Sequence, residues 1–240
     1  AAFKEMFNQD YFASAASGLT SINLTQAAVK QKASALYAHA APQINADLSD
    51  WFDAMPLEIK QTNQIQEELV PWNGNADLSG KLFVKWDEKN LYIGADIVDD
   101  VPFINSKKGK NIWNGDAIEL TIGLASTSDA NRNSFQSSDF QIGLSAGNEQ
   151  GSMPLIWVWT KSGSAEGGEI AVKRSENPKG YVLEAKIPWM SLNNFVPSPG
   201  QKISFDVAFD DADIKDREKQ MVWSGDFLFY KDPGVWGELE

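Results

Sequence analysis

Apolar and polar residues alternate through most of the chain after residue 44, which is the pattern of strands with one buried face. Ile118, Leu120 and Ile122, for example, alternate with Glu119 and Thr121. Similar short apolar or alternating runs lie at 82–86, 91–98, 140–144, 155–160, 169–173, 181–187, 203–209 and 221–223. Turn residues, and no helical spacers, separate these runs. The pattern therefore predicts an all-β fold, an antiparallel two-sheet β-sandwich of the jelly-roll kind.

The start of the chain has a different period. Phe3 and Phe7 recur at helical spacing, and a second apolar face that includes Leu36 follows before a proline ends the pattern. We therefore expect residues 1–41 to form a short helical extension or linker. Residues 42–240 are expected to form the β-sandwich domain.

Composition and charge narrow the classes of function. The chain carries 33 acidic and 21 basic residues, a formal charge of −12, so nucleic acid is not an expected partner. It has no cysteine and one histidine, His39, which excludes thiolate metal sites and leaves little room for histidine chemistry. No apolar run approaches the roughly 20 residues of a membrane span, and the first residues lack the pattern of a signal peptide.

Acidic residues follow two of the predicted strands. Asp99 and Asp100 end one strand, and Asp210, Asp211 and Asp213 follow another. Calcium takes oxygen ligands from such loops, although the spacing matches no EF-hand. Solvated turn acids explain the same pattern equally well. A structural calcium ion at these residues is therefore an expectation with an open alternative.

Aromatic residues fall into two groups. Trp157 and Trp159 share one face of a predicted strand and are expected in the core. Trp113 and Tyr230 instead lie in polar loops, where a ring has little to pack against unless a flat ligand binds. Sugar rings expose a flat C–H face of this kind. These two rings are the candidate ligand platform.

Over residues 42–240 the chain resembles a known family, the family 9 carbohydrate-binding modules. The matching motifs occur in order at 42–51, 83–93, 113–120, 180–189, 222–225 and 236–239. The most distinctive is Trp-Asn-Gly-Asp-Ala-Ile-Glu-Leu at 113–120. The resemblance implies a β-sandwich attached to a secreted enzyme that degrades plant polysaccharides. It also implies a structural calcium ion.

The resemblance further implies a sugar site. Trp113 matches one of two clamping rings, and Glu119 matches the acid that binds sugar hydroxyls. Tyr230 falls where the family usually has the second ring, a tryptophan. Gln141 and Gly143 stand where the family has an arginine and an asparagine, and we expect Gln141 to contribute to the site.

The implied function is that of a non-catalytic module that binds a polysaccharide or oligosaccharide of the glucan or xylan class. The protein is then expected outside the cell or at its surface, as a monomer or a module of a larger enzyme. A small glycoside hydrolase is one alternative, because that chemistry needs only two carboxylates roughly 5–10 Å apart. A haem-binding sandwich is another, with His39 and either Met153 or Met221 as axial ligands.

Overall fold

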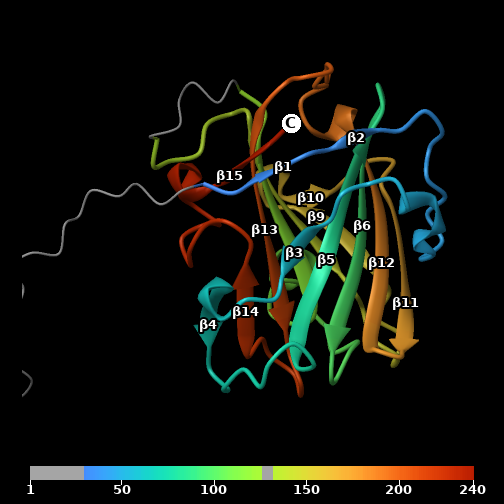
Figure 1. Ribbon diagram of the computed structural model, residues 1–240, viewed down its shortest axis with the longest axis vertical. Helices are drawn as coiled ribbons and strands as arrows, with labels where there is room; N and C mark the ends of the chain where they lie inside the picture. The colour runs from blue at the N-terminus through green and yellow to red at the C-terminus, as the bar shows by residue number, and fades with distance from the viewer. Residues whose placement is uncertain (1–29, 126–131) are drawn as a thin grey trace, which may run out of the picture.

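The computed structural model describes residues 30–125 and 132–240, which form two facing sheets (Figure 1). Sheet A contains, in spatial order, β1 (Lys32–Ala33), β15 (Gly237–Leu239), β13 (Ile203–Asp211), β7 (Ala117–Gly123), β8 (Asp139–Ser145), β9 (Leu155–Val158) and β10 (Gly163–Ser164), with β14 (Lys219–Val222) on β13 and β4 (Ile65–Glu68) on β14. Sheet B contains β11 (Glu169–Glu176), β12 (Lys179–Pro188), β6 (Asn90–Asp99), β5 (Leu78–Trp86) and β2 (Leu36–Tyr37), with β3 (Leu57–Ile59) also on β5.

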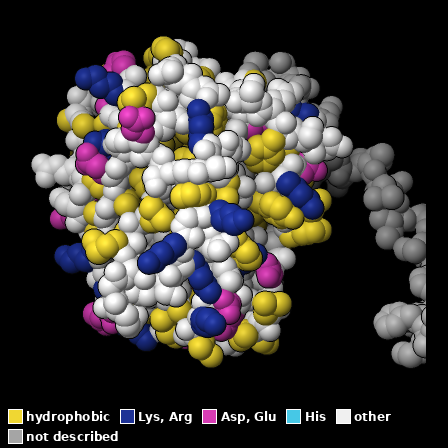
Figure 2. Space-filling model, turned by 180° about the vertical axis from the view of Figure 1, so that it is seen from behind, with side chains coloured by type: hydrophobic (Ala, Val, Ile, Leu, Met, Phe, Trp, Pro, Cys, Tyr) yellow, Lys and Arg dark blue, Asp and Glu magenta, His cyan; other side chains and the backbone are white. Residues whose placement is uncertain are grey.

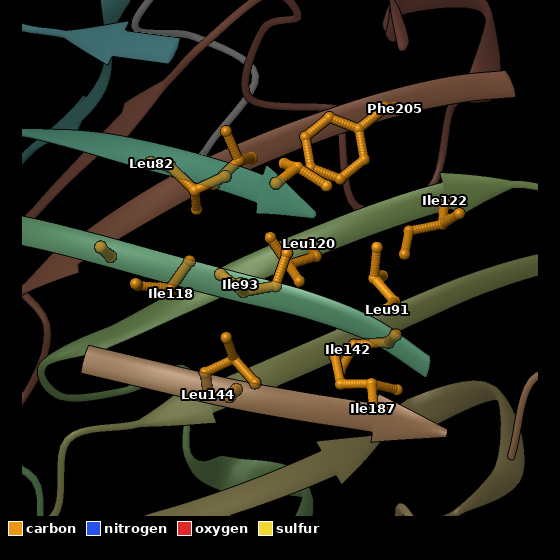
Figure 3. Packing of buried hydrophobic residues seen from close by; sticks show 14 of the residues in the cluster. Leu82, Leu91, Ile93, Ile118, Leu120, Ile122, Ile142, Leu144, Ile187 and Phe205 are labelled. Atoms are coloured by element: carbon orange, nitrogen blue, oxygen red, sulfur yellow. The ribbon is translucent and has the colours of Figure 1, made fainter. Parts of the chain in front are cut away.

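The core lies between the two sheets. Ile118, Leu120 and Ile122 of β7 are fully buried and point toward apolar side chains of sheet B, among them Leu82 and Ile93 (Figure 3). Because alternate residues of a strand face opposite sides, the period of two places one half of each strand in this layer. The predicted β-sandwich is confirmed, and each of the predicted apolar runs contains or overlaps a strand.

Short 3₁₀ turns connect the strands. They are η1 (Leu48–Trp51), η2 (Thr62–Gln64), η3 (Gly109–Asn111), η5 (Trp159–Lys161), η6 (Trp189–Ser191) and η7 (Pro233–Val235). None of the helices in the described ranges is long and apolar enough to cross a membrane.

The expected helical extension is wrong over residues 30–41. Residues 1–29 lie outside the described residues. The remainder contains no helix and forms β1 and β2, each of two residues. Both pair in parallel, β1 with β15 and β2 with β5, so the sandwich is mixed rather than purely antiparallel.

Backbone pairing explains why the helical pattern does not produce a helix here. The Ala35 amide donates to the carbonyl of Glu240 at 2.7 Å, and the Ala38 amide donates to the carbonyl of Trp86 at 2.8 Å. The edges of both sheets thus receive partners for backbone groups that would otherwise stay unpaired. Apolar residues at helical spacing favour a helix only weakly, and the pairing of this segment with the two sheets overrides that preference.

The outer face of sheet A is covered in its middle. Glu119 and Thr121 of β7 point away from the core, yet both are buried. The loop around η3, the turn η5 and the loop before β14 each contribute residues that line a cavity together with Glu119. Figure 2 shows the molecule from the side opposite to that of Figure 1, so that sheet A is nearer the viewer than sheet B. Hydrophobic side chains are visible across this side, with Lys and Arg side chains among them. The covering loops create the site described next.

Candidate functional site

A cavity of about 580 Å³ opens on the outer face of sheet A, and we call it the outer cavity. Trp113, Glu119, Gln141 and Tyr230 all line it. The four residues come from a loop, two neighbouring strands and a turn near the C-terminus. The structure therefore brings together every residue that the sequence predicted for the sugar site.

The Asn105 side chain anchors the loop that carries Trp113. The Asn105 side-chain amide donates to the carbonyls of Ile112, at 2.8 Å, and Asp116, at 3.0 Å. A Cβ at Gly115 would lie 2.7 Å from the Asn105 side chain, so only glycine allows this approach. Trp113 itself is 38% exposed. The Trp113 ring is thus partly exposed to solvent, while hydrogen bonds to Asn105 fix the backbone on either side of it.

Tyr230 lies next to a buried anchor. Phe229 is fully buried, and its carbonyl accepts from the Trp236 indole N–H at 2.6 Å. The Asp232 carboxylate accepts from the Gly234 amide at 2.8 Å and begins the following turn. Tyr230 is 44% exposed, because its neighbours fix the backbone while its ring faces outward.

Glu119 forms the polar floor of the outer cavity. Its Oε2 accepts from the Gln141 amide at 2.8 Å, and its Oε1 accepts from the Gln220 amide at 3.3 Å. Burial raises the pKa of Glu119 well above its usual range, and nearby Asp210 raises that pKa further. Arg217 opposes both effects.

Arg217 is a residue of this site that the sequence did not reveal. Its guanidinium carbon lies 4.8 Å from the centre of the Trp113 ring, a cation–π contact. Its Nη1 donates to Asp210 at 2.9 Å and to Glu119 at 3.4 Å, and its Nη2 donates to Glu67. Arg217 lies in a loop with charges of both signs, so no local pattern marks it. It brings a guanidinium to the outer cavity, which Gln141 also lines.

Trp157 and Trp159 were both expected in the core, but each is only partly buried and neither belongs to the core between the sheets. Trp159 begins η5 and lines the outer cavity. Its indole N–H donates to the Lys110 carbonyl at 2.8 Å. Ile156 and Val158 of β9 are buried in the core, so the alternation of this strand places Trp157, and position 159 after it, on the outer face of sheet A.

A second group of polar residues, the acid cluster, lies at one end of the sandwich. Its members, from the ends of β6 and β13 and the loops before β5 and β7, are Asp77, Asp99, Asp100, Asp116, Asp211 and Asp213. Within the cluster, sets of three carboxylates place oxygens within 4.8 Å of one another. Four of the five predicted metal residues belong to it.

Asp210 is the predicted metal residue that lies elsewhere. Asp210 and Asp211 are successive residues of β13, so their side chains point to opposite sides. Asp210 therefore reaches the floor of the outer cavity, where it accepts from Arg217 and from Gln220 at 2.7 Å. Asp77 and Asp116 take part in the cluster instead, although the sequence did not single them out.

The charges of the acid cluster are only partly balanced. Lys219 Nζ lies 2.8 Å from Asp211 Oδ2 and 3.0 Å from Asp77 Oδ1, while the buried Oδ1 atoms of Asp211 and Asp213 have no partner. Burial, together with neighbouring carboxylates, raises the pKa of Asp99 to about 9. Carboxylate oxygens without a partner are groups to which a hard cation such as calcium can bind.

One further cavity, of about 350 Å³, lies between residues 34–37 and the loop after η6. Trp86, Trp189 and Phe195 line it. It contains none of the predicted site residues and few charged groups, so the outer cavity remains the candidate site.

The chain matches one protein family over residues 49–240, described as carbohydrate family 9 binding domain-like. It belongs to this family. Among curated relatives of the family 9 domain, endo-1,4-beta-xylanase A of Thermotoga neapolitana is 28% identical over 207 residues, which cover 84% of this chain and 17% of that protein. Endo-1,4-beta-xylanase C of Paenibacillus barcinonensis is 30% identical over 174 residues, which cover 71% and 14%. The chain thus spans less than a fifth of the length of these relatives.

Solved structures agree with the family 9 domain in fold. A carbohydrate-binding module of family 9 from Caldicellulosiruptor kristjanssonii, in complex with cellotriose, superposes with a TM-score of 0.63 at 17% identity, covering 88% of this chain and 93% of that one. The same module in complex with glucose gives a TM-score of 0.62 at 19% identity, over 88% and 95%. The low identity means that these structures support the architecture alone.

Proposed function

We propose that this family 9 domain binds the glucan or xylan class of polysaccharide through Trp113 and Tyr230, without catalysing a reaction. The observation that carries the proposal is the outer cavity itself. Two exposed rings from separate loops meet there with a buried carboxylate and its amide partner. Aromatic faces suit the C–H face of a pyranose, while Glu119 and Gln141 suit its hydroxyls.

The similar proteins support this choice of ligand. The curated relatives are named as endo-1,4-beta-xylanases, and the superposed modules hold cellotriose and glucose. We further propose that the domain targets a secreted polysaccharide-degrading enzyme to its substrate. Its small share of those xylanases agrees with an accessory role, because most of their length lies outside the matched segment.

The buried carboxyls in the outer cavity do not suit glycoside hydrolysis. Glu119 and Asp210 both accept from the same two side chains, Arg217 and Gln220, so they lie together on one side of the cavity. A hydrolase instead holds its two carboxyls about 5–10 Å apart on either side of the bond. The haem alternative is also disfavoured. Met221 is buried in the core, Met153 is 79% exposed, and His39 packs against Tyr37.

Calorimetry with oligosaccharides tests the clamp. We expect the unmodified chain to bind cello- or xylo-oligosaccharides with a Kd between about 1 mM and 1 μM. Trp113→Ala and Tyr230→Ala should each weaken binding about 30-fold, because stacked aromatic anchors carry about 2 kcal/mol or more. Phe52→Ala is the matched control, since Phe52 is 89% exposed and does not line the cavity.

The fold of each variant is checked by circular dichroism before binding is measured. Parent-like affinity in both ring variants would place the sugar elsewhere. Sustained release of reducing sugar from a polysaccharide panel would contradict the non-catalytic role.

We also propose that the acid cluster holds a structural calcium ion. Asp99, Asp100, Asp211 and Asp213 would supply the oxygens, and the unpartnered buried oxygens of Asp211 and Asp213 fit such a group. The bound ion would offset the repulsion between these carboxylates and would fix the loops that carry them. Asp116 is already occupied, because it accepts from the amides of Ile104 and Ala212.

Thermal unfolding with and without chelator tests the calcium proposal. A cation at 100 times its Kd adds about 2.7 kcal/mol to the free energy of unfolding. Chelation should therefore lower Tm by about 5 °C or more, and Asp211→Asn should abolish the response. An identical melting curve in chelator and in excess calcium would refute this proposal.

A further inference from the structure

Gly143 lets an aromatic ring lie against the floor of the outer cavity. A Cβ at this position would be 2.4 Å from Cη2 of Trp159, which is closer than two non-bonded carbon atoms approach each other. The far end of the indole therefore rests on the backbone of β8. Because Gly143 pairs in register with Glu119 of β7, the ring end lies beside the carboxylate that we assign to sugar hydroxyls.

The Trp159 ring is held at both ends. Its six-membered ring rests over Gly143, and its indole N–H is bonded to the Lys110 carbonyl. A side chain fixed in this way loses little conformational freedom when a ligand binds, so that more of the contact energy appears as affinity. The ring is partly exposed and lines the outer cavity, which leaves part of its surface free for a ligand.

Polar groups lie next to this ring. Lys110 and Asn111 also line the outer cavity, and both are exposed. Within residues 30–125 and 132–240, their side chains make no hydrogen bond or ion pair, so each is free to bind a hydroxyl. Trp159 thus combines a flat apolar surface with hydroxyl-binding groups at its edge, as the proposed clamp does with Glu119 and Gln141.

The outer cavity is larger than a slot between two rings needs to be. Its volume of about 580 Å³ is within the ordinary range for sites that enclose a whole small ligand. Trp113 and Tyr230 account for one pyranose, and Trp159 comes from a third segment of the chain. We propose that Trp159 forms a second subsite, which stacks on the next pyranose of a β-1,4-linked glucan or xylan chain.

This inference rests on the proposed function, and pairs of sugars of different length separate the two. Calorimetry compares glucose with cellobiose, and xylose with xylobiose, on the full chain. For Trp159→Ala we expect a loss of at least about 10-fold for the disaccharides, equal to about 1.4 kcal/mol. Affinity for the monosaccharides should change less than about two-fold. Trp159→Phe, which keeps a ring but loses the N–H bond to Lys110, should retain most of the disaccharide affinity.

The pattern of losses distinguishes stacking from support. If Trp159 only holds the η3 loop, Trp159→Ala and Trp159→Phe will weaken both sugars of a pair by the same factor, which overturns the second subsite. Unchanged affinities in Trp159→Ala overturn it as well. If the parent binds none of the four sugars, the proposed function itself fails. Phe52→Ala serves again as the control.

Discussion

Asp206 of β13 is a fully buried carboxylate that holds the chain after β14. It accepts from the amides of Gly225, at 2.7 Å, Val207, at 2.9 Å, and Ser224, at 3.0 Å. Burial raises its pKa to about 7, and the three backbone bonds oppose that shift without cancelling it. The residue therefore links the folding free energy to pH.

The sign of this effect follows from proton uptake. The unfolded residue titrates near 3.8 and the folded one near 7, so the folded state holds more protons between these values. The free energy of unfolding due to Asp206 should thus fall as pH rises from about 4 to about 7, and level off above. Chemical denaturation of the parent and of Asp206→Asn over pH 4 to 8 measures this. A stability difference between them that stays constant across that range would contradict the assignment.

At the scale of elements, β13 and β14 each serve both sites. Lys219 and Gln220 are successive residues of β14, and their side chains point to opposite sides. Gln220 bonds Asp210 in the floor of the outer cavity, whereas Lys219 contacts Asp211 in the acid cluster. The strand pair thereby carries one wall of each site.

Removal of the buried ammonium of β14 should be costly. Lys219 is 1% exposed, so Lys219→Met leaves its carboxylate partners without their cation and should lower the free energy of unfolding by about 3–5 kcal/mol. Lys202→Met is the matched control. Lys202 pairs with Glu238 at the surface, where such a pair contributes about 0–1 kcal/mol. Urea denaturation of both variants gives the comparison, and equal losses would show that the buried pair is not special.

Long strands were predictable because burial of one face forces alternation over many residues, as in β7 and β13. The short strands were not, because two residues such as those of β1 contain no period. Trp113, Tyr230 and Glu119 could be found because a family motif or a polar loop marks them. Arg217 and Trp159 could not, since their roles depend on which loops fold over sheet A. Asp210 differs from these two, because the alternation that buries Phe209 already places the Asp210 side chain on the opposite face from Asp211.

At the scale of the whole molecule, residues 31–38 tie the two sheets together. β1 (Lys32–Ala33) pairs with β15 of sheet A. Shortly after it in the chain, β2 (Leu36–Tyr37) pairs with β5 of sheet B. Four backbone bonds flank these pairs, at Gln31–Glu238, Ala33–Glu240, Ala35–Glu240 and Ala38–Trp86. The segment acts as a strap across both edges and contributes no residue to the outer cavity.

A chain that begins at Pro42 tests this strap. Loss of the four flanking bonds, each worth about 1 kcal/mol, should lower Tm by about 5 °C or more. Sugar affinity should stay within about two-fold of the full chain, because the outer cavity is intact. A chain that begins at Lys30 is the control. A ten-fold loss of affinity with the fold intact would mean that the strap helps to build the site.

The parallel pairing of β1 with β15 has a mechanical consequence. A pull on residue 30 and on residue 240 draws two parallel strands past each other in opposite directions. Their hydrogen bonds are then loaded together in shear, rather than opened one after another as in a zipper. A domain anchored to a solid and held through these two points would resist tension through β1 and β15, and its lifetime would be set by the rate of forced unfolding.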